Sequence, residues 1–503
     1  MRNKSYAMNP SPLVSFLEKP ATEFTRDDIM KFVEKHQIEM INFRYVAADG
    51  KLKTLNFVIN NLDHLEIILT TGERVDGSSL FSFVDAGSSD LYVVPRYSTA
   101  FVNPFESIPT IDILCSYYNS EGQPLESAPE YLLQKAHKSF KDATGMNFLA
   151  LGELEYYVMT EVYEDMDYPA EDQKGYHASA PFAKFEDFRR EAMYLIAQCG
   201  GQIKYGHSEV GNFTQDDMYY EQQEIEFLPC PVEEAADQLV IAKWILRKLS
   251  YQYDILLSLA PKITVGKAGS GLHVHMMMEK DGKNMLVENG KLSDIAKRAI
   301  AGILDLAGAL TAFGNTIPTS YLRLVPHQEA PTNICWGDRN RSVLVRVPLG
   351  WLSDVDMISH ANSQQDKTSR EFMSKQTFEL RSGDGSADIY GFLSGIVIAA
   401  QHGLEMENAL EIAEKLYVSV NIFDDEHKER LDQLKALPES CYESAIELEK
   451  RRDSFEKNDI FPAGLISSMI EQLKAFDDKD LSERLYGKHD EIAALVKKHL
   501  HCM

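Results

Sequence analysis

The sequence lacks any apolar run long enough to cross a membrane. Its most apolar stretches are GFLSGIVIAA and AIAGILDLAGALTAF, whereas a spanning helix needs about 20 predominantly apolar residues. The first residues, MRNKSYAMNPSPLVSFLEKP, also lack the long apolar region of a secretory signal peptide. We therefore expect no membrane insertion and no secretion.

The sequence is also short of positive charge and of closely spaced cysteines. It has 51 Lys and Arg residues against 77 Asp and Glu residues, a formal net charge of −26. Nucleic acids and anionic membranes are bound through clustered cations, so this balance argues against both partners. The six cysteines are scattered and form no CxxC pair, which is typical of a reduced protein rather than a disulfide scaffold or a zinc ribbon. The predicted location is the cytoplasm.

The chain of 503 residues is long enough for more than one domain, with 44% hydrophobic residues to build the cores. Residues 25–120 predict a small α+β unit, because a helix opens at Thr25 or Arg26 and a hairpin surrounds the Asp49-Gly50 turn. Residues 121–503 predict a larger domain of strands and long helices. It begins with a helix capped by Ser127 and ends in a charged helical region, and residues 1–24 form an extension.

Four short segments share one pattern, in which polar side chains two residues apart interrupt an apolar strand. Residues at this spacing lie on the same face of a strand. One interpretation is a solvated antiparallel sheet with ordinary strand histidines. The other is a single site to which these faces all point. The segments are GELEYYV with Glu153 and Glu155, EQQEIEF with Glu224 and Glu226, SGLHVHM with His273 and His275, and FELRSGDG with Glu379 and Arg381.

If the four strands meet in one sheet, several carboxylates converge with a histidine. Like charges raise each other's pKa, and divalent cations remove that cost. A set of mostly oxygen ligands with one imidazole suits Mg²⁺ or Mn²⁺ better than structural zinc. The sequence therefore predicts a divalent-metal site on this sheet.

The segment SYLRLVPHQEAPTNICWGDRNRSVLVRVP supplies the opposite charge. It contains Arg323, Arg339, Arg341 and Arg346 around Glu329. Guanidinium groups hold carboxylates and phosphates through paired hydrogen bonds, so metals beside arginines indicate phosphoryl transfer with a carboxylate-bearing substrate. No Walker A motif occurs, which argues against a P-loop nucleotide site.

The order DGSS, GELE, GHSEV, QQEIEF, GSGLHVH, SYLRLVPHQEAP, RNRS and ELRSGDGSA closely resembles the glutamine synthetase family over residues 25–400. The resemblance implies an α+β fold, with an N-terminal β-grasp domain and a catalytic domain whose curved antiparallel sheet forms a funnel flanked by helices. It also implies a homo-oligomeric ring, a dodecamer of two stacked hexamers with active sites between neighbouring subunits.

The resemblance assigns roles by position. Residues for two or more Mg²⁺ or Mn²⁺ ions are Glu155, Glu209 and Glu224 near the substrate, and Glu153, His273 and Glu379 near the phosphates of ATP. Those for ATP are His275, Arg341 and Arg346, and those for glutamate and phosphate are Gly269, Arg323, Arg341 and Arg381. Asp76, Ser79 and Tyr176 match the ammonium site, with Asp76 and Ser79 lent by the adjacent subunit, and Glu329 matches the flap that closes over the intermediate.

The implied reaction joins ammonium to the γ-carboxylate of L-glutamate, with ATP as cosubstrate and γ-glutamyl phosphate as intermediate. A γ-glutamyl ligase for an organic amine and a catalytically silent relative are the alternatives. Two departures stand out: Ala268 replaces the usual asparagine before Gly269, and Asp388-Ile389-Tyr390 replaces the usual NPY. Since the lost amide lies beside the glutamate head group, we expect Ala268 to weaken glutamate binding.

Overall fold

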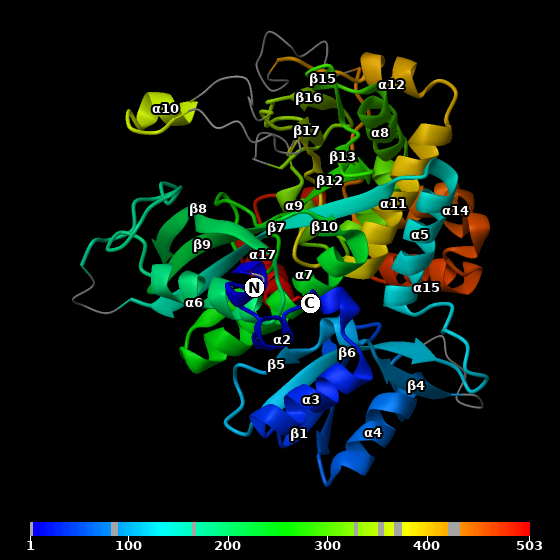
Figure 1. Ribbon diagram of the computed structural model, residues 1–503. Coiled ribbons are helices and arrows are strands. Elements are labelled where there is room, and N and C mark those ends of the chain that lie inside the picture. Colours follow the sequence, from blue (N-terminus) through cyan, green and yellow to red (C-terminus); the bar gives the residue numbers. More distant parts are fainter. Residues whose placement is uncertain are drawn as a thin grey trace.

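The computed structural model describes residues 4–81, 89–162, 167–325, 330–350, 357–366, 375–420 and 433–502. The N-terminal region forms a separate layered domain below the larger C-terminal domain (Figure 1). Within the described ranges, no helix is both long and apolar enough to cross a membrane.

The N-terminal domain is a mixed sheet covered by helices. Its strand order is β2-β1-β6-β4-β3, with β1 parallel to β6 and β5 paired to β6. The predicted hairpin is confirmed, since β1 and β2 are antiparallel. The predicted helix start is confirmed as well: Thr25 and Asp28 form a capping box at the start of α3. The elements are α1 Lys4–Ala7, α2 Pro12–Leu17, α3 Arg26–His36, β1 Met40–Val46, β2 Leu52–Val58, α4 Leu62–Thr71, β3 Glu73–Asp76, β4 Asp90–Pro95, β5 Phe101–Val102 and β6 Thr110–Tyr118.

The larger domain is built on a long, curved sheet with the order β16-β17-β18-β12-β7-β9-β8. Its pairs are antiparallel except for β16 with β17. Strands β10 and β11 pair with β7, and β13 pairs with β12. The strands are β7 Asn147–Glu161, β8 Ile203–Gln215, β9 Met218–Phe227, β10 Cys230–Pro231, β11 Leu256–Ser258, β12 Leu272–Lys280, β13 Lys283–Asn284, β16 Trp336–Asp338, β17 Val345–Val347 and β18 Phe378–Leu380.

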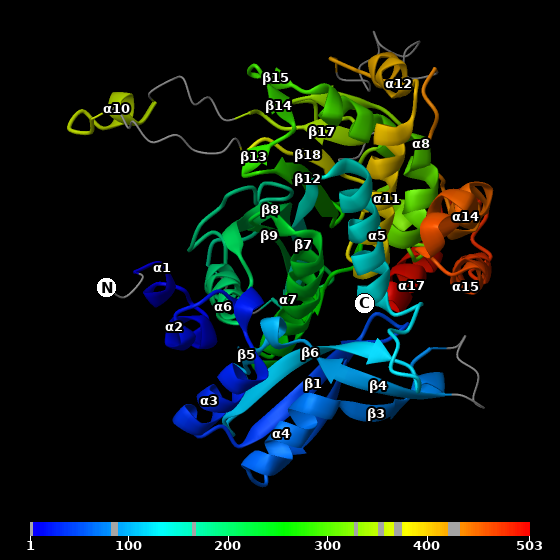
Figure 2. The same ribbon diagram turned by 45° about the vertical axis from the view of Figure 1, so that its right-hand side comes forward.

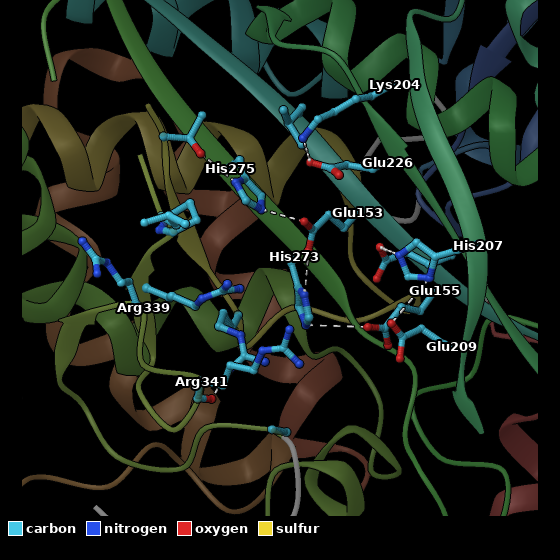
Figure 3. A pocket seen from close by; sticks show the side chains of 18 of the residues that line it. Glu153, Glu155, Lys204, His207, Glu209, Glu226, His273, His275, Arg339 and Arg341 are labelled. Carbon is cyan, nitrogen blue, oxygen red and sulfur yellow. Dashed lines mark hydrogen bonds and ion pairs between the residues drawn. The ribbon is translucent and has the colours of Figure 1, made fainter. Parts of the chain in front are cut away.

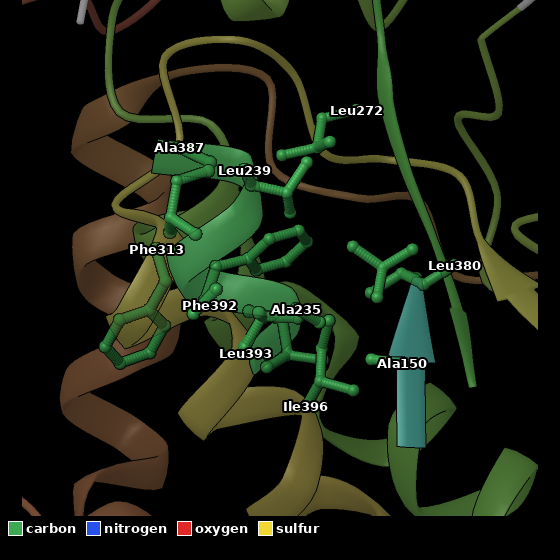
Figure 4. Close-up of a cluster of buried hydrophobic side chains, with 14 of the residues drawn as sticks. Ala150, Ala235, Leu239, Leu272, Phe313, Leu380, Ala387, Phe392, Leu393 and Ile396 are labelled. Atoms are coloured by element: carbon green, nitrogen blue, oxygen red, sulfur yellow. The ribbon is translucent and has the colours of Figure 1, made fainter. Parts of the chain in front are cut away.

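Long helices cover one side of this sheet (Figure 2). Apolar side chains of α7 and α11, such as Leu239, Phe392 and Ile396, pack with Leu272 of β12 and Leu380 of β18 in one buried cluster (Figure 4). The opposite face carries the polar members of each strand, so the sheet's alternation sends its charges to the side that the helices leave open. The helices are α5 Pro129–Thr144, α6 Glu186–Gln198, α7 Val232–Gln252, α8 Asp294–Gly314, α9 Ser320–Arg323, α10 Met357–Ala361, α11 Ile389–Glu405 and α12 Ala409–Lys415.

The C-terminal region is helical, as its charge density predicts, and packs beside α8 and α11. It contains α14 Cys441–Glu456, α15 Ala463–Lys474, α16 Leu481–Arg484 and α17 His489–His499. One predicted cap is wrong: α5 begins at Pro129 with Ala128 as its N-cap, and Ser127 makes no side-chain cap. Proline is favoured in the first turn because its missing N–H needs no partner there.

The two domains are joined by a buried polar contact. The two terminal nitrogens of the Arg96 guanidinium group, Nη1 and Nη2, donate to Asp237 of α7, at 2.7 and 2.8 Å. The Tyr390 hydroxyl donates to the same carboxylate at 2.6 Å. The adjacent Asp388 caps α11, because its side chain accepts from the N–H of Gly391 at 3.2 Å. The departure at Asp388-Ile389-Tyr390 therefore lies at the domain junction.

Candidate active site

A cavity of about 1640 Å³ opens on the polar face of the long, curved sheet. It is larger than the 300–1,000 Å³ of a typical small-molecule site, which suits two substrates together. The close-up shows acidic and histidine side chains from β7, β8, β9 and β12 facing arginines from the other wall (Figure 3). The predicted site residues that line it are Glu153, Glu155, Tyr176, Glu209, Glu224, Gly269, His273, His275, Arg323, Arg341, Arg346 and Arg381.

Strand register explains this convergence. On β7, Glu153 lies opposite His273 of β12 and Glu226 of β9. Two residues further on, Glu155 lies opposite Glu224. Partners in register are about 5 Å apart, so the acidic side chains form two adjacent rows across the sheet.

The first row contains an ion-pair chain centred on His275. Its Nε2 lies 2.9 Å from Glu153 Oε1 and 2.7 Å from Glu379 Oε2. The other oxygen of Glu153 is 3.0 Å from His273 Nδ1. Glu379 is fully buried behind the cavity wall and does not line it. His273 and His275 thus contact the same carboxylate.

Charge decides the protonation of this row. Burial disfavours the charged form of each group, but the carboxylates Glu153 and Glu379 raise the pKa of His275 to about 10. In return, and against the effect of burial, His275 lowers the pKa of Glu379 to about 2 and holds that of Glu153 well below its usual range. Within the protein alone, His275 is therefore the cation that these two acids share, and Glu379 also pairs with Arg346 and Arg381.

Among the described residues, the second row has no comparable cation. Glu224 Oε1 is 3.1 Å from His207 Nε2, and Glu209 Oε1 is 3.8 Å from His207 Nδ1. Burial first, then repulsion from Glu155 and Glu224, raises the pKa of Glu209 to about 8. Burial and the neighbouring glutamates Glu153 and Glu155 also raise the pKa of Glu224 well above its usual range. This row is short of positive charge.

The donors present fit divalent cations. Two groups offer ligand atoms within 4.8 Å of one another: Glu153, Glu226 and His275, and His207, Glu209 and Glu224. Buried carboxylates whose pKa values are raised by one another are the surroundings that a hard cation stabilises. The groups overlap the two predicted ligand sets without matching them. One group has Glu226 and His275 in place of Glu379 and His273, and the other has His207 in place of Glu155. The assignment of individual ligands stays a prediction.

Arginines form the facing wall. Arg323 donates to the main-chain oxygens of Ser382 and Gly383, at 3.0 and 3.2 Å, and its Nη2 is 3.4 Å from His273 Nε2. Arg346 Nη1 and Arg381 Nε lie 3.1 and 3.2 Å from Glu379 Oε1. Strand β18 ends at Leu380, so Arg381 stands just beyond it rather than within the strand as predicted.

The glycine turn before β12 allows close approach to this wall. A Cβ at Gly271 would lie 2.4 Å from Arg323 Nη2 and 2.8 Å from His273 Nε2. The N–H of Gly271 donates to Glu155 Oε2 at 2.6 Å. Any side chain here would push the arginine away from the histidine, so the turn needs glycine.

The loop residue Ala268 has an amide partner that the sequence did not reveal. Its N–H donates to Gln173 Oε1 at 2.8 Å, and its C=O accepts from the Tyr157 hydroxyl at 2.9 Å. Gln173 Nε2 is buried and has no hydrogen-bond partner among the described residues. A side-chain amide therefore lies beside the position where the usual asparagine is missing, although it comes from a segment 95 residues away.

One further site residue, His207, was missed, although the same spacing signal could have identified it, and Glu226 was marked by that spacing but was given no role. His207 precedes Glu209 by two residues on β8, and Glu226 follows Glu224 by two on β9. Glu226 is 2% exposed and pairs with Lys204 at 2.6 Å. His207 also makes an edge-on contact with the Tyr176 ring, whose centroid is 5.5 Å away.

Besides Glu379, two predicted residues, Asp76 and Ser79, do not line this cavity in the described chain. Asp76 and Ser79 lie at the end of β3 in the N-terminal domain and are not among its lining residues. There, hydrogen bonds from Ser79, Ser78 and Ser89 lower the pKa of Asp76 to about 2. Glu329 lies outside the described residues.

Comparison with known proteins agrees with this geometry. Residues 126–475 match the family model described as glutamine synthetase, catalytic domain, and residues 37–120 match the model of its β-grasp domain. Glutamine synthetase of Staphylococcus epidermidis is 28% identical over 430 residues, covering 84% of this chain and 88% of the relative. That of Microchaete diplosiphon is 30% identical, covering 65% and 74%.

Solved structures show the same fold. Plasmodium falciparum glutamine synthetase matches with a TM-score of 0.73 at 18% identity, covering 94% of this chain and 98% of that one. A ligand-free GmaS structure matches with a TM-score of 0.69 at 16% identity, covering 90% and 96%. With both family domains matched in order across most of its length, the chain belongs to the glutamine synthetase family.

Proposed function

We propose that this protein is an ATP-dependent ligase that joins ammonium to the γ-carboxylate of L-glutamate through γ-glutamyl phosphate. The observation that carries the proposal is one cavity with two acidic rows on one wall and a set of arginines on the other. The acidic rows suit the cations that accompany ATP, and the arginines suit the anionic groups that react.

Glu153, His273 and Glu379 would hold one divalent cation, with Glu155, Glu209 and Glu224 holding a second. Mg²⁺ or Mn²⁺ would supply charge neutralisation for the phosphates of ATP. When a cation occupies the first row, His275 is no longer needed to balance Glu153 and Glu379. Its imidazole would then be available to the nucleotide, the role that the resemblance gives it.

The arginines would align the two reacting anions. Arg323 is fixed by main-chain carbonyls beside His273, so it can hold an anionic oxygen of the substrate without moving. Arg341 lines the same cavity, and its main-chain oxygen accepts from Arg381 Nη1. Together they would bring the γ-carboxylate of glutamate and the terminal phosphate of ATP into contact and stabilise the charge that develops during transfer.

Ammonium would then lose a proton, and the resulting ammonia would attack the acyl phosphate and displace inorganic phosphate. Tyr176 and Glu209 border the cavity beside His207 and would lie next to the ammonium, whose proton would pass to a neighbouring carboxylate. Asp76 and Ser79 would complete this site from a neighbouring subunit of a ring, since they do not line the cavity of their own chain. Glu329 would close the site against water.

The test is phosphate release from ATP with glutamate and either ammonium or a panel of primary amines. Ammonium-dependent release, with glutamine as product, is the expected result. Preference for methylamine or a larger amine would make the protein a γ-glutamyl ligase for organic amines. Absence of release with every acceptor would identify a catalytically silent relative.

A further inference from the structure

A second cavity, of about 380 Å³, lies between the N-terminal domain and the catalytic domain. Its walls are the turn before β2, one side of α7 and the start of α11. In Figure 2 the sheet of the N-terminal domain lies directly below α7. The segment Asp388-Ile389-Tyr390, which departs from the family pattern, belongs to this wall.

Four cationic side chains line this junction cavity: Lys51, Lys243, Arg247 and Lys248. None of them forms an ion pair with an acidic side chain within the described part of the chain. Asp388 is the acidic residue among those lining the cavity, and its carboxylate already caps α11. Asp384 and Asp388 attract the Lys243 ammonium without forming an ion pair, so the positive charge of the four cations is only partly compensated within the described residues.

Two of these cations lie close together and one of them is buried, so their positive charge lowers the stability of the folded protein. Lys243 is 5% exposed, and its ammonium donates to a main-chain carbonyl, that of Gly385, at 2.9 Å. Arg247 lies one turn further along α7 and donates to the main-chain oxygen of Cys502 at 2.6 Å. Like charges at this helical spacing repel each other, and burial strengthens the repulsion. An anion in the cavity would offset that cost.

We propose that the junction cavity binds a compact anion with at least two negative charges, either a phosphate or a short dicarboxylate. The ligand would bridge Lys51 of the N-terminal domain to Lys243 and Arg247 of the catalytic domain. The volume suits a small metabolite, and a guanidinium group recognises phosphate and carboxylate equally well. The site is distinct from the catalytic cavity, because the two share no lining residue.

Trp244 provides a local signal, since it lines the junction cavity and the chain contains three tryptophans. Changing Trp336→Phe and Trp351→Phe leaves Trp244 as the sole indole. Its emission is followed during separate titrations with inorganic phosphate and succinate, with ionic strength held constant by sodium chloride. We expect a saturable change with at least one anion, and the more effective anion identifies the ligand class.

Arg247→Gln in this background should weaken the apparent affinity at least tenfold. Arg452→Gln is the matched control, because Arg452 lies on α14 and pairs with Glu449 and Glu456. A His273→Ala variant separates this site from the catalytic one: it should retain the Trp244 response whatever the enzyme catalyses. No saturable response, or equal affinity in the Arg247→Gln variant, would overturn the proposal.

If the variant that keeps only Trp244 fails to fold, a second measurement tests the proposal without tryptophan substitutions. Equilibrium dialysis with radiolabelled phosphate and succinate then compares the otherwise unmodified protein with its Arg247→Gln variant. We expect the variant to lose one bound anion per chain while keeping any bound in the catalytic cavity. Equal stoichiometry in the two proteins would rule out the junction site.

Discussion

Replacing Gln173 with alanine should weaken glutamate binding specifically. In the structure the Gln173 side chain accepts from the Ala268 N–H at 2.8 Å, and its own buried Nε2 has no partner among the described residues. We infer that this amide takes the place of the asparagine that is missing at position 268. The change removes that donor and leaves the Ala268 N–H without its acceptor.

The expected effect follows from the energy of one hydrogen bond. A neutral bond contributes about 0.5 to 1.5 kcal/mol, which corresponds to about a twofold to tenfold increase in the KM for glutamate. The KM for ATP should change by less than about twofold, because Ala268 and Gln173 are absent from the row that suits the phosphates. Both constants are obtained from phosphate release at saturating concentrations of the other substrates.

A double-mutant cycle makes the reasoning refutable. Ala268→Asn alone should alter the KM for glutamate little, because Gln173 already supplies an amide. In the Gln173→Ala background the same change should recover most of the lost affinity, so the two effects are non-additive. Additive effects, or an unchanged KM for glutamate in Gln173→Ala, would show that the Gln173 amide does not serve the substrate.

The other predictions concern charge, assembly and pH. His273→Ala and Glu379→Ala should both abolish turnover. Glu379→Ala should in addition lower the free energy of unfolding by about 3 to 5 kcal/mol, because it leaves buried cations without their carboxylate. Equal unfolding free energies for the two variants would contradict this. Mixed rings of Asp76→Ala and Glu329→Ala subunits should regain activity that neither has alone, and failure to complement would place the whole site within one chain. Burial, with a smaller contribution from Arg247, lowers the pKa of Lys243 from 10.5 to about 8. The buried lysine therefore destabilises the folded protein below pH 8, and this loss of stability disappears as the pH rises to 10.5. Lys243→Met should therefore raise the free energy of unfolding at pH 7 by up to about 3 kcal/mol, and by clearly less at pH 9.5, in denaturant titrations; an equal gain at both values would refute the assignment.

Much of this site was encoded in local sequence. Alternation with a period of two marked Glu153, Glu155, Glu224 and His273 as residues of shared faces, because a strand sends every second side chain to the same side. The hairpin around Asp49-Gly50 and the helix beginning at Arg26 were equally local, since a turn and a capping box are completed within a few residues. Such features can be predicted from the sequence without knowing what packs against them.

Register and long-range contact were decided by the tertiary structure. Which carboxylate faces which histidine depends on how β7 aligns with β9 and β12, and periodicity is the same for every alignment that differs by two residues. The position of His275 between Glu153 and Glu379 follows from that alignment. Gln173 beside Ala268 could not be predicted either, because the contact spans 95 residues. The cations of the junction cavity could not be grouped from the sequence, because Lys51 is far along the chain from Lys243 and Arg247 and meets them only where the N-terminal domain packs against α7.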